Sequence, residues 1–191
     1  MRTMAQQTRT ANDAKTQAAR IPDATQNPGR RRITRWAKGV WTGLMAGSVA
    51  IILEMVLFPG TGRGGFWDPV RLSASIALGN RAIATSTPIT FDIFFVGMLI
   101  HYIVAIWYAV VLGMIIRSLS PPIAVLTGAA YGSAIYLLNF YGLSGLYPWV
   151  SHDRNWIFFV GHLAFGMAAG WLYNQLHLGQ FSRRLREQSI S

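Results

Sequence analysis

Four polar side chains interrupt the apolar runs of this chain and carry groups that could do chemistry inside a membrane. They are Glu54, His101, Asn139 and His162. A carboxylate and two imidazoles can relay protons, and they are also ligands of iron, manganese or zinc. Two imidazoles at similar depth could instead hold a haem axially. Because an unpaired ionisable group costs about 2.5–3.5 kcal/mol inside a bilayer, we expect the four side chains to face one another.

The composition indicates what kind of protein positions these groups. The chain has 191 residues, of which 52% are hydrophobic and only 13% are charged. A soluble domain usually has about 25% charged residues, so the balance is that of a membrane protein. The absence of cysteine excludes disulfides, iron–sulfur clusters and thiolate metal sites. Nine of the 17 Lys and Arg precede residue 39, a distribution that indicates basic membrane flanks rather than nucleic-acid binding.

Four apolar runs are long enough to cross about 30 Å of hydrocarbon. They cover residues 41–58, 93–116, 123–143 and 156–176. The sequence therefore predicts an all-α bundle of four transmembrane helices within residues 39–177. Residues 1–38 and 178–191 are interpreted as basic cytoplasmic tails, the first of them disordered, that bind the anionic inner leaflet.

The basic residues also predict the orientation of the chain. If the N-terminus is cytoplasmic, 13 Lys and Arg lie inside and four lie outside, which favours cytoplasmic N- and C-termini. The long loop of residues 59–90 then faces outward. In this loop Asp68 is typical of an N-cap, Pro69 of a first helical residue and Gly79 of a helix end. These signals predict a short interfacial helix.

Glycines four residues apart occur in three of the four runs. The pairs are Gly43 and Gly47, Gly128 and Gly132, and Gly166 and Gly170. In lipid, small residues at this spacing let helix backbones approach closely. We therefore expect these faces to pack helices and to support a homo-oligomer.

The glycines and the polar residues recur in the same register. Glu54 follows Gly43 by eleven residues, and Asn139 follows Gly128 by eleven, so each lies on a helix face with its glycine. The residues that share a face with the two histidines are Ala105, Tyr108 and Ala109 on the second run and Gly166, Ala169, Gly170 and Tyr173 on the fourth. This pattern indicates two parallel copies of a helical hairpin.

Evidence for catalysis is weak in this sequence. Ser151-His152-Asp153 has the residue types of a hydrolase triad, but consecutive side chains diverge and cannot all meet. We interpret the segment as the polar tip of a loop. The sequence thus favours a protein that is not an enzyme.

Four segments carry a resemblance to a known group of proteins. They read LIHYIVAIWYAVV, PPIAVLTGAAYG, NFYGLSGLYPW and VGHLAFG. Through them the chain resembles small bacterial inner-membrane proteins of the YagU-like group over residues 40–176. The resemblance implies a bacterial inner-membrane location and draws attention to His162, but it implies no substrate, mechanism or cofactor.

Three functions remain open from the sequence. The first is to support the movement of an ion, a proton or a small solute through the Glu54, His101 and His162 cluster. The second is a structural or accessory membrane subunit whose polar network fixes helix register. The third is a haem- or metal-binding protein that uses the same three side chains as donors. No cofactor is required by the sequence, and the expected partners are the lipid bilayer and a second copy or another membrane protein.

Overall fold

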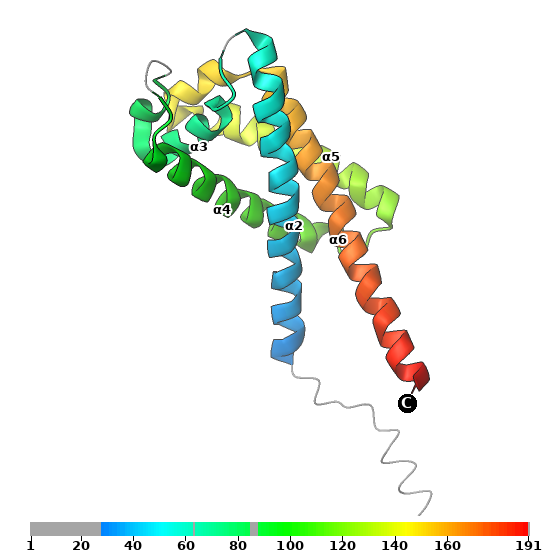
Figure 1. Cartoon of the computed structure of the whole chain (residues 1–191). Coiled ribbons are helices and arrows are strands. Elements are labelled where there is room, and N and C mark those ends of the chain that lie inside the picture. The colour runs from blue at the N-terminus through cyan, green and yellow to red at the C-terminus, as the bar shows by residue number, and fades with distance from the viewer. Residues whose placement is uncertain (1–27, 63, 85–87, 191) are drawn as a thin grey trace, which may run out of the picture. The chain divides into compact units, whose positions relative to one another are not determined.

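The computed structural model describes residues 28–62, 64–84 and 88–190, with side chains described for residues 36–62, 64–84 and 88–176. Backbone contacts divide the chain into two units, Met1–Arg35 and Trp36–Ser191, and all side chains discussed below belong to the second. Residues 1–27 of the predicted disordered tail lie outside the described residues. Every regular element in the described residues is helical (Figure 1).

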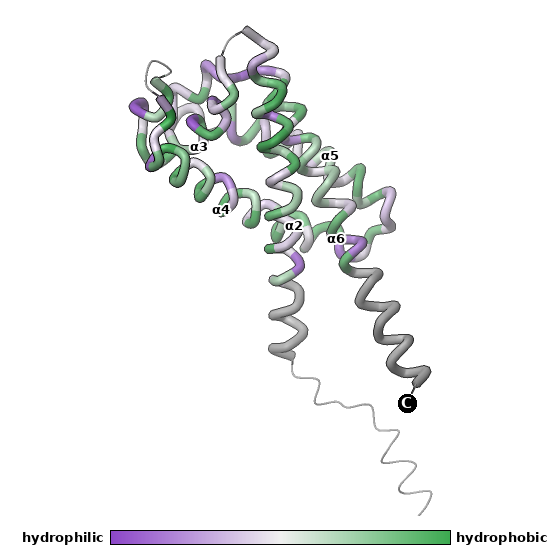
Figure 2. Tube along the Cα trace, in the orientation of Figure 1, coloured by the Kyte–Doolittle hydropathy of each residue, from purple (hydrophilic) through white to green (hydrophobic). Residues whose placement is uncertain are grey.

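Four helices are long and apolar enough to cross a membrane, which confirms the predicted all-α, multi-pass fold. They are α2 (Pro28–Leu57), α4 (Phe91–Ile116), α5 (Pro121–Leu137) and α6 (Trp156–Ile190). Their apolar spans run Trp36–Thr61, Phe91–Ile116, Pro121–Gly145 and Trp156–Leu176. Figure 2 shows apolar residues along each of these spans. The shorter elements are η1 (Phe58–Thr61), α3 (Asp68–Leu78), η2 (Gly79–Ala82), η3 (Leu138–Gly142), η4 (Leu143–Gly145) and η5 (Pro148–Asp153).

The first and last helices extend beyond the predicted spans. α2 begins at Pro28, so residues 28–38 are helical and the prediction of disorder is wrong for them, and α6 continues as a helix through residues 178–190 of the predicted C-terminal tail. Proline is favoured in the first turn of a helix, and the Arg-rich turn that follows has good helix propensity. Residues 180–190 contain neither glycine nor proline, so nothing in that sequence ends the last helix early.

The predicted short helix in the first loop is α3, and it packs into the bundle. Asp68 is its first helical residue rather than its N-cap, and the Asp68 carboxylate accepts a hydrogen bond from the N–H of Gly65 at 2.9 Å. The helix ends at Gly79, whose φ of +66° is favourable only for glycine. Val70 is fully buried, and Gly97 of α4 lies against the backbone of Val70. Close backbone contact therefore holds α3 on α4.

α5 and α6 pack through the predicted glycine stripes. Gly128 lies against Gly166 so closely that a Cβ on either residue would collide with the carbonyl of the other. Gly132 lies in the same way against the backbone of His162, and Gly170 lies against the backbone of α5. These glycine faces thus pack two helices of the same chain against each other, and the expected homo-oligomer stays a prediction.

α2 packs on α4 in a matching register. Gly43 lies against the backbone of Ile106, and Gly47 lies against Ala105 and the ring of His101. In the pair formed by α5 and α6, the position that corresponds to Gly47 is Gly132, which contacts His162. Gly47 meets side chains of α4, whereas Gly132 meets the backbone of α6, so the two helix pairs share glycine positions but not the same closeness of approach.

α4 slants away from α6 toward the end of the bundle that holds α3 (Figure 1). At its other end, α4 meets α6 where the ring of Tyr173 covers Gly113, and Leu112 and Ile116 are almost fully buried there. α3 packs on the slanting part of α4. Polar residues of both α4 and α6 line one cavity beside this slanting part.

Candidate functional site

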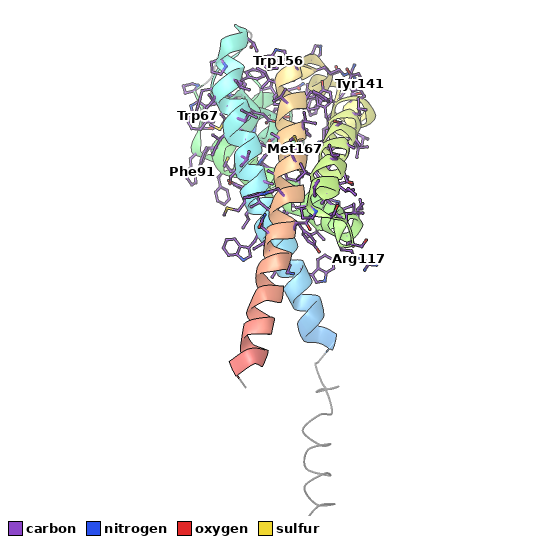
Figure 3. All side chains as sticks on the ribbon, turned by 90° about the vertical axis from the view of Figure 1, so that its right-hand side faces the viewer. Trp67, Phe91, Arg117, Tyr141, Trp156 and Met167 are labelled. Carbon is purple, nitrogen blue, oxygen red and sulfur yellow. The ribbon has the colours of Figure 1, made fainter. Side chains whose placement is uncertain are left out.

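A cavity of about 370 Å³ is lined by residues of α2, α3, α4, α5, α6 and the segment between α5 and α6. It contains all four side chains singled out in the sequence. The polar side chains on its wall are Glu54, Ser73, His101, Tyr108, Asn139, Tyr147 and His162. In Figure 3, Tyr141 and Trp156 mark the end of the bundle near the cavity, and Arg117 lies toward the opposite end.

Three of these side chains form a hydrogen-bonded chain that joins α4, η3 and α6. The hydroxyl of Tyr108 donates to Oδ1 of Asn139 at 2.8 Å, and Nδ2 of Asn139 donates to Nε2 of His162 at 3.2 Å. Nδ1 of His162 donates to the carbonyl of Phe158 at 2.7 Å. With one ring nitrogen donating and the other accepting, His162 is a neutral imidazole that carries its proton on Nδ1.

Glu54 lies beside this chain without joining it. Its Oε1 is 3.7 Å from Nδ1 of His162, whose proton points to the carbonyl of Phe158, so the contact is too long for a hydrogen bond. The Glu54 side chain is only 7% exposed and has no hydrogen-bond partner among the described residues. Gly161 makes room for it, because a Cβ at Gly161 would collide with the carboxyl group. Glu54 is therefore a buried carboxyl group that lines the cavity and makes no hydrogen bond to the described residues.

His101 lines the cavity but does not join the chain. Its Nε2 donates to the carbonyl of Gly47 at 3.0 Å, which ties α4 to α2. A Cβ at Gly47 would collide with the side chain of Ala105, so this glycine lets α2 and α4 approach closely beside the His101 ring. The structure thus brings Glu54, Asn139 and His162 together, whereas His101 is engaged with a backbone carbonyl, unlike the mutual contact expected from the sequence.

The predicted site did not include Tyr108, and it did not include the π-helical turn that carries Asn139. Tyr108 follows His101 by seven residues and so lies on the same face of α4, which is the signal that could have identified it. Asn139 lies in η3, a π-helical turn that continues α5, and such turns are frequent at functional sites. Arg154 stabilises this turn by donating from Nε to the carbonyl of Phe140 at 2.8 Å.

The expected metal donors do not converge on a common point. Both ring nitrogens of His162 and Nε2 of His101 are already hydrogen-bonded within the protein. Across the described part of the chain, no three His, Asp or Glu side chains form a group that could hold a metal ion. The set of Glu54, His101 and His162 does not fit a metal centre in this arrangement.

The triad-like letters Ser151-His152-Asp153 are engaged separately. The Ser151 hydroxyl donates to the carbonyl of Pro148 at 2.6 Å, and Nδ1 of His152 donates to the carbonyl of Trp149 at 3.3 Å. The serine and the histidine are each turned toward the local backbone. The segment is a 3₁₀ turn of the loop, consistent with its interpretation from the sequence.

A second, polar cavity of about 160 Å³ lies between α3 and this loop. Asp68, Arg71, His152 and Asp153 are among its lining residues. Burial, followed by the nearby carboxylate of Asp68, raises the pKa of Asp153 to about 6, and His152 partly offsets this. Because the folded protein binds this proton more tightly than the unfolded chain, ionised Asp153 destabilises the fold above about pH 6, and the penalty disappears as the pH falls toward 4.

Asp153→Asn is therefore expected to raise the melting temperature at about pH 7.5, where it removes the buried charge. At about pH 3 the gain should largely vanish, because Asp153 is then mostly protonated in both the folded and the unfolded state. The measurement is thermal unfolding of the two purified proteins across this pH range. An equal gain at every pH would show that charge burial at Asp153 is not the cause.

The comparisons with known proteins add no family to this description. No protein-family model, curated protein or solved structure matches the chain. The YagU-like resemblance stays a prediction from the sequence. The fold is that of a multi-pass membrane protein, and its mainly apolar cavity is open on one side to the surroundings of the bundle.

Proposed function

We propose that this protein binds a small, mostly apolar solute in the large cavity and supports its movement in a bacterial inner membrane, with both termini cytoplasmic. The cavity carries the proposal. Its volume of about 370 Å³ falls in the range of about 300–1,000 Å³ that is typical of small-molecule sites. Its wall combines an apolar lining with a few polar groups, as such sites do. The orientation is supported by the 13 to four distribution of basic residues.

The polar groups on the wall divide into two sets with different roles. Tyr108, Asn139 and His162 use their hydrogen-bonding groups on one another and on the backbone, an arrangement that fixes α4, η3 and α6 in register. This supports a structural role for these three residues. Glu54 makes no such hydrogen bond and is the one acidic side chain in the lining, so it is the group best able to exchange a proton or pair with a charged part of a solute.

Filling the cavity from α3 should abolish binding. Ser73 lines the cavity, so Ser73→Phe places an aromatic ring in the space that the solute needs. Ala77 lies on the same helix, is exposed and is not part of the cavity lining, which makes Ala77→Phe the matched control. With tert-butylbenzene as a neutral apolar probe and the protein in nanodiscs, saturation-transfer NMR should show binding to the wild type and to Ala77→Phe only.

Transport is tested separately with the same pair of variants. Proteoliposomes that contain the wild type or Ala77→Phe should move a water-soluble probe of similar shape faster than liposomes with Ser73→Phe. Binding of the neutral probe that is unchanged by Ser73→Phe would contradict the proposal, because the probe would then lie outside the cavity.

A further inference from the structure

The side chains that line the large cavity can supply a full negative charge but no permanent positive charge. Glu54 is the one acidic residue that lines it, and none of the lining residues is Lys or Arg. The two imidazoles on its wall donate to backbone carbonyls, His101 to Gly47 and His162 to Phe158, and the bonding of His162 is that of the neutral ring. An anionic solute would find no full positive charge here. A cationic solute would give the carboxylate of Glu54 its missing partner.

Aromatic rings form much of the remaining wall. Those that line the cavity are Tyr108, Phe140, Tyr147, Phe158 and Phe165. The ring centroids of Phe140 and Phe158 are 5.1 Å apart, and the centroid of Phe140 is 5.9 Å from that of His162. Aromatic faces attract cations through their quadrupole, most strongly where water is excluded. The wall thus suits a cation whose remaining surface is apolar.

Few groups near Glu54 can compete with such a cation. The titratable and polar side chains that share its cavity are His162 from α6, His101 and Tyr108 from α4, Tyr147 from the loop before η5, Asn139 from η3 and Ser73 from α3. Arg71 of α3 lines the second cavity instead and donates to the carbonyls of Ala82 and Ala84. An ionised carboxylate without a partner is costly in such surroundings, so Glu54 is stabilised either by a proton or by a cation beside it.

We infer that the cavity binds small lipophilic organic cations of the aryl ammonium type, and that the cation and a proton compete for Glu54. The inference rests on the proposed function, because it names the class of solute that the cavity takes. When the cation enters, the Glu54 carboxyl group releases its proton to water and the resulting carboxylate pairs with the ammonium group. One positive charge enters and one leaves, and no bond within the cation changes.

Two probes of the same shape test this inference. Phenyltrimethylammonium carries the charge, and tert-butylbenzene is its neutral carbon isostere. The full-length wild type in nanodiscs should bind the cation at least about tenfold more tightly than the isostere. It should also release close to one proton per bound cation in weakly buffered solution. Lowering the pH should weaken binding of the cation and leave the isostere unaffected.

Glu54→Gln separates the charge from the shape of the side chain. This variant should bind the isostere as the wild type does, which also shows that it is folded, and it should lose the preference for the cation. Equal affinities for the two probes in the wild type, or a preference that survives in Glu54→Gln, would overturn the inference and leave the proposed function standing. If neither probe binds the wild type, the proposed function itself fails. Should Glu54→Gln not fold, the wild type alone decides, because cation binding without proton release overturns the inference.

Discussion

Gly128→Ala should lower the unfolding free energy of the protein, and by more than Gly145→Ala. A Cβ at this position would collide with the carbonyl of Gly166, and that carbonyl belongs to a helix backbone that cannot rotate away. Alanine favours a helix over glycine by about 1 kcal/mol, but overpacking a tight contact costs about 1–3 kcal/mol or more. Because α5 and α6 would have to separate along their whole contact, we expect the upper end of this range. The measurement is the unfolding free energy in mixed micelles containing SDS.

Gly145→Ala is the control for this prediction. Gly145 lies in η4, and a Cβ there would have no heavy atom within 4 Å, so the same chemical change should be close to neutral. A Gly128→Ala protein as stable as Gly145→Ala would contradict the close packing of the two helices. A loss of oligomers with an intact monomer would instead place Gly128 between copies of the chain, as the sequence first suggested.

Asn139→Leu should destabilise the protein, whereas Glu54→Gln should not. The leucine leaves the hydroxyl of Tyr108 and Nε2 of His162 without partners, and each unsatisfied buried group costs about 1–3 kcal/mol. Hydrogen bonds inside membranes average only about 0.6 kcal/mol in double-mutant cycles, so the expected loss lies near the lower end, about 1–3 kcal/mol in total. Glutamine keeps the shape of Glu54 and breaks no hydrogen bond, so its unfolding free energy should match or exceed that of the wild type.

Tyr108→Phe completes the test as a double-mutant cycle with Asn139→Leu. The two changes remove opposite ends of one hydrogen bond, so their combined effect should be smaller than the sum of the single effects. Additive effects would show that the hydrogen bond contributes nothing to the fold. A large loss of stability in Glu54→Gln would contradict the division of the wall into a structural set and a free carboxyl group.

The features that could be predicted from the sequence are those set by local patterns. The apolar runs identified the four long helices, and the signals at Pro69 and Gly79 located α3 closely. The helical periodicity of the glycines placed Glu54 and Asn139 on the sides of their helices that lie near His162 in the structure. A helix face follows from periodicity alone, so these positions needed no knowledge of the other helices.

The features that could not be predicted depend on contacts between helices. Nothing in the periodicity shows that His101 finds the carbonyl of Gly47, because backbone acceptors have no sequence signature. The π-helical turn at Asn139 also departs from the period of about 3.6 residues per turn by which side chains are assigned to helix faces. The glycine pairs predicted close approach, but they could not show whether the partner helix lies in the same chain or in another copy.

Gly161 and His162 are two adjacent residues of α6 on which three helices depend. Gly161 has no side chain and so leaves space for the carboxyl group of Glu54 from α2. The backbone of His162 contacts Gly132 of α5, and the His162 ring accepts a hydrogen bond from Asn139 of η3. Substitution at any one of these positions changes the space or the hydrogen bonding available to the others. In evolutionary terms the five positions form one unit, so we expect them to change together among related chains or not at all.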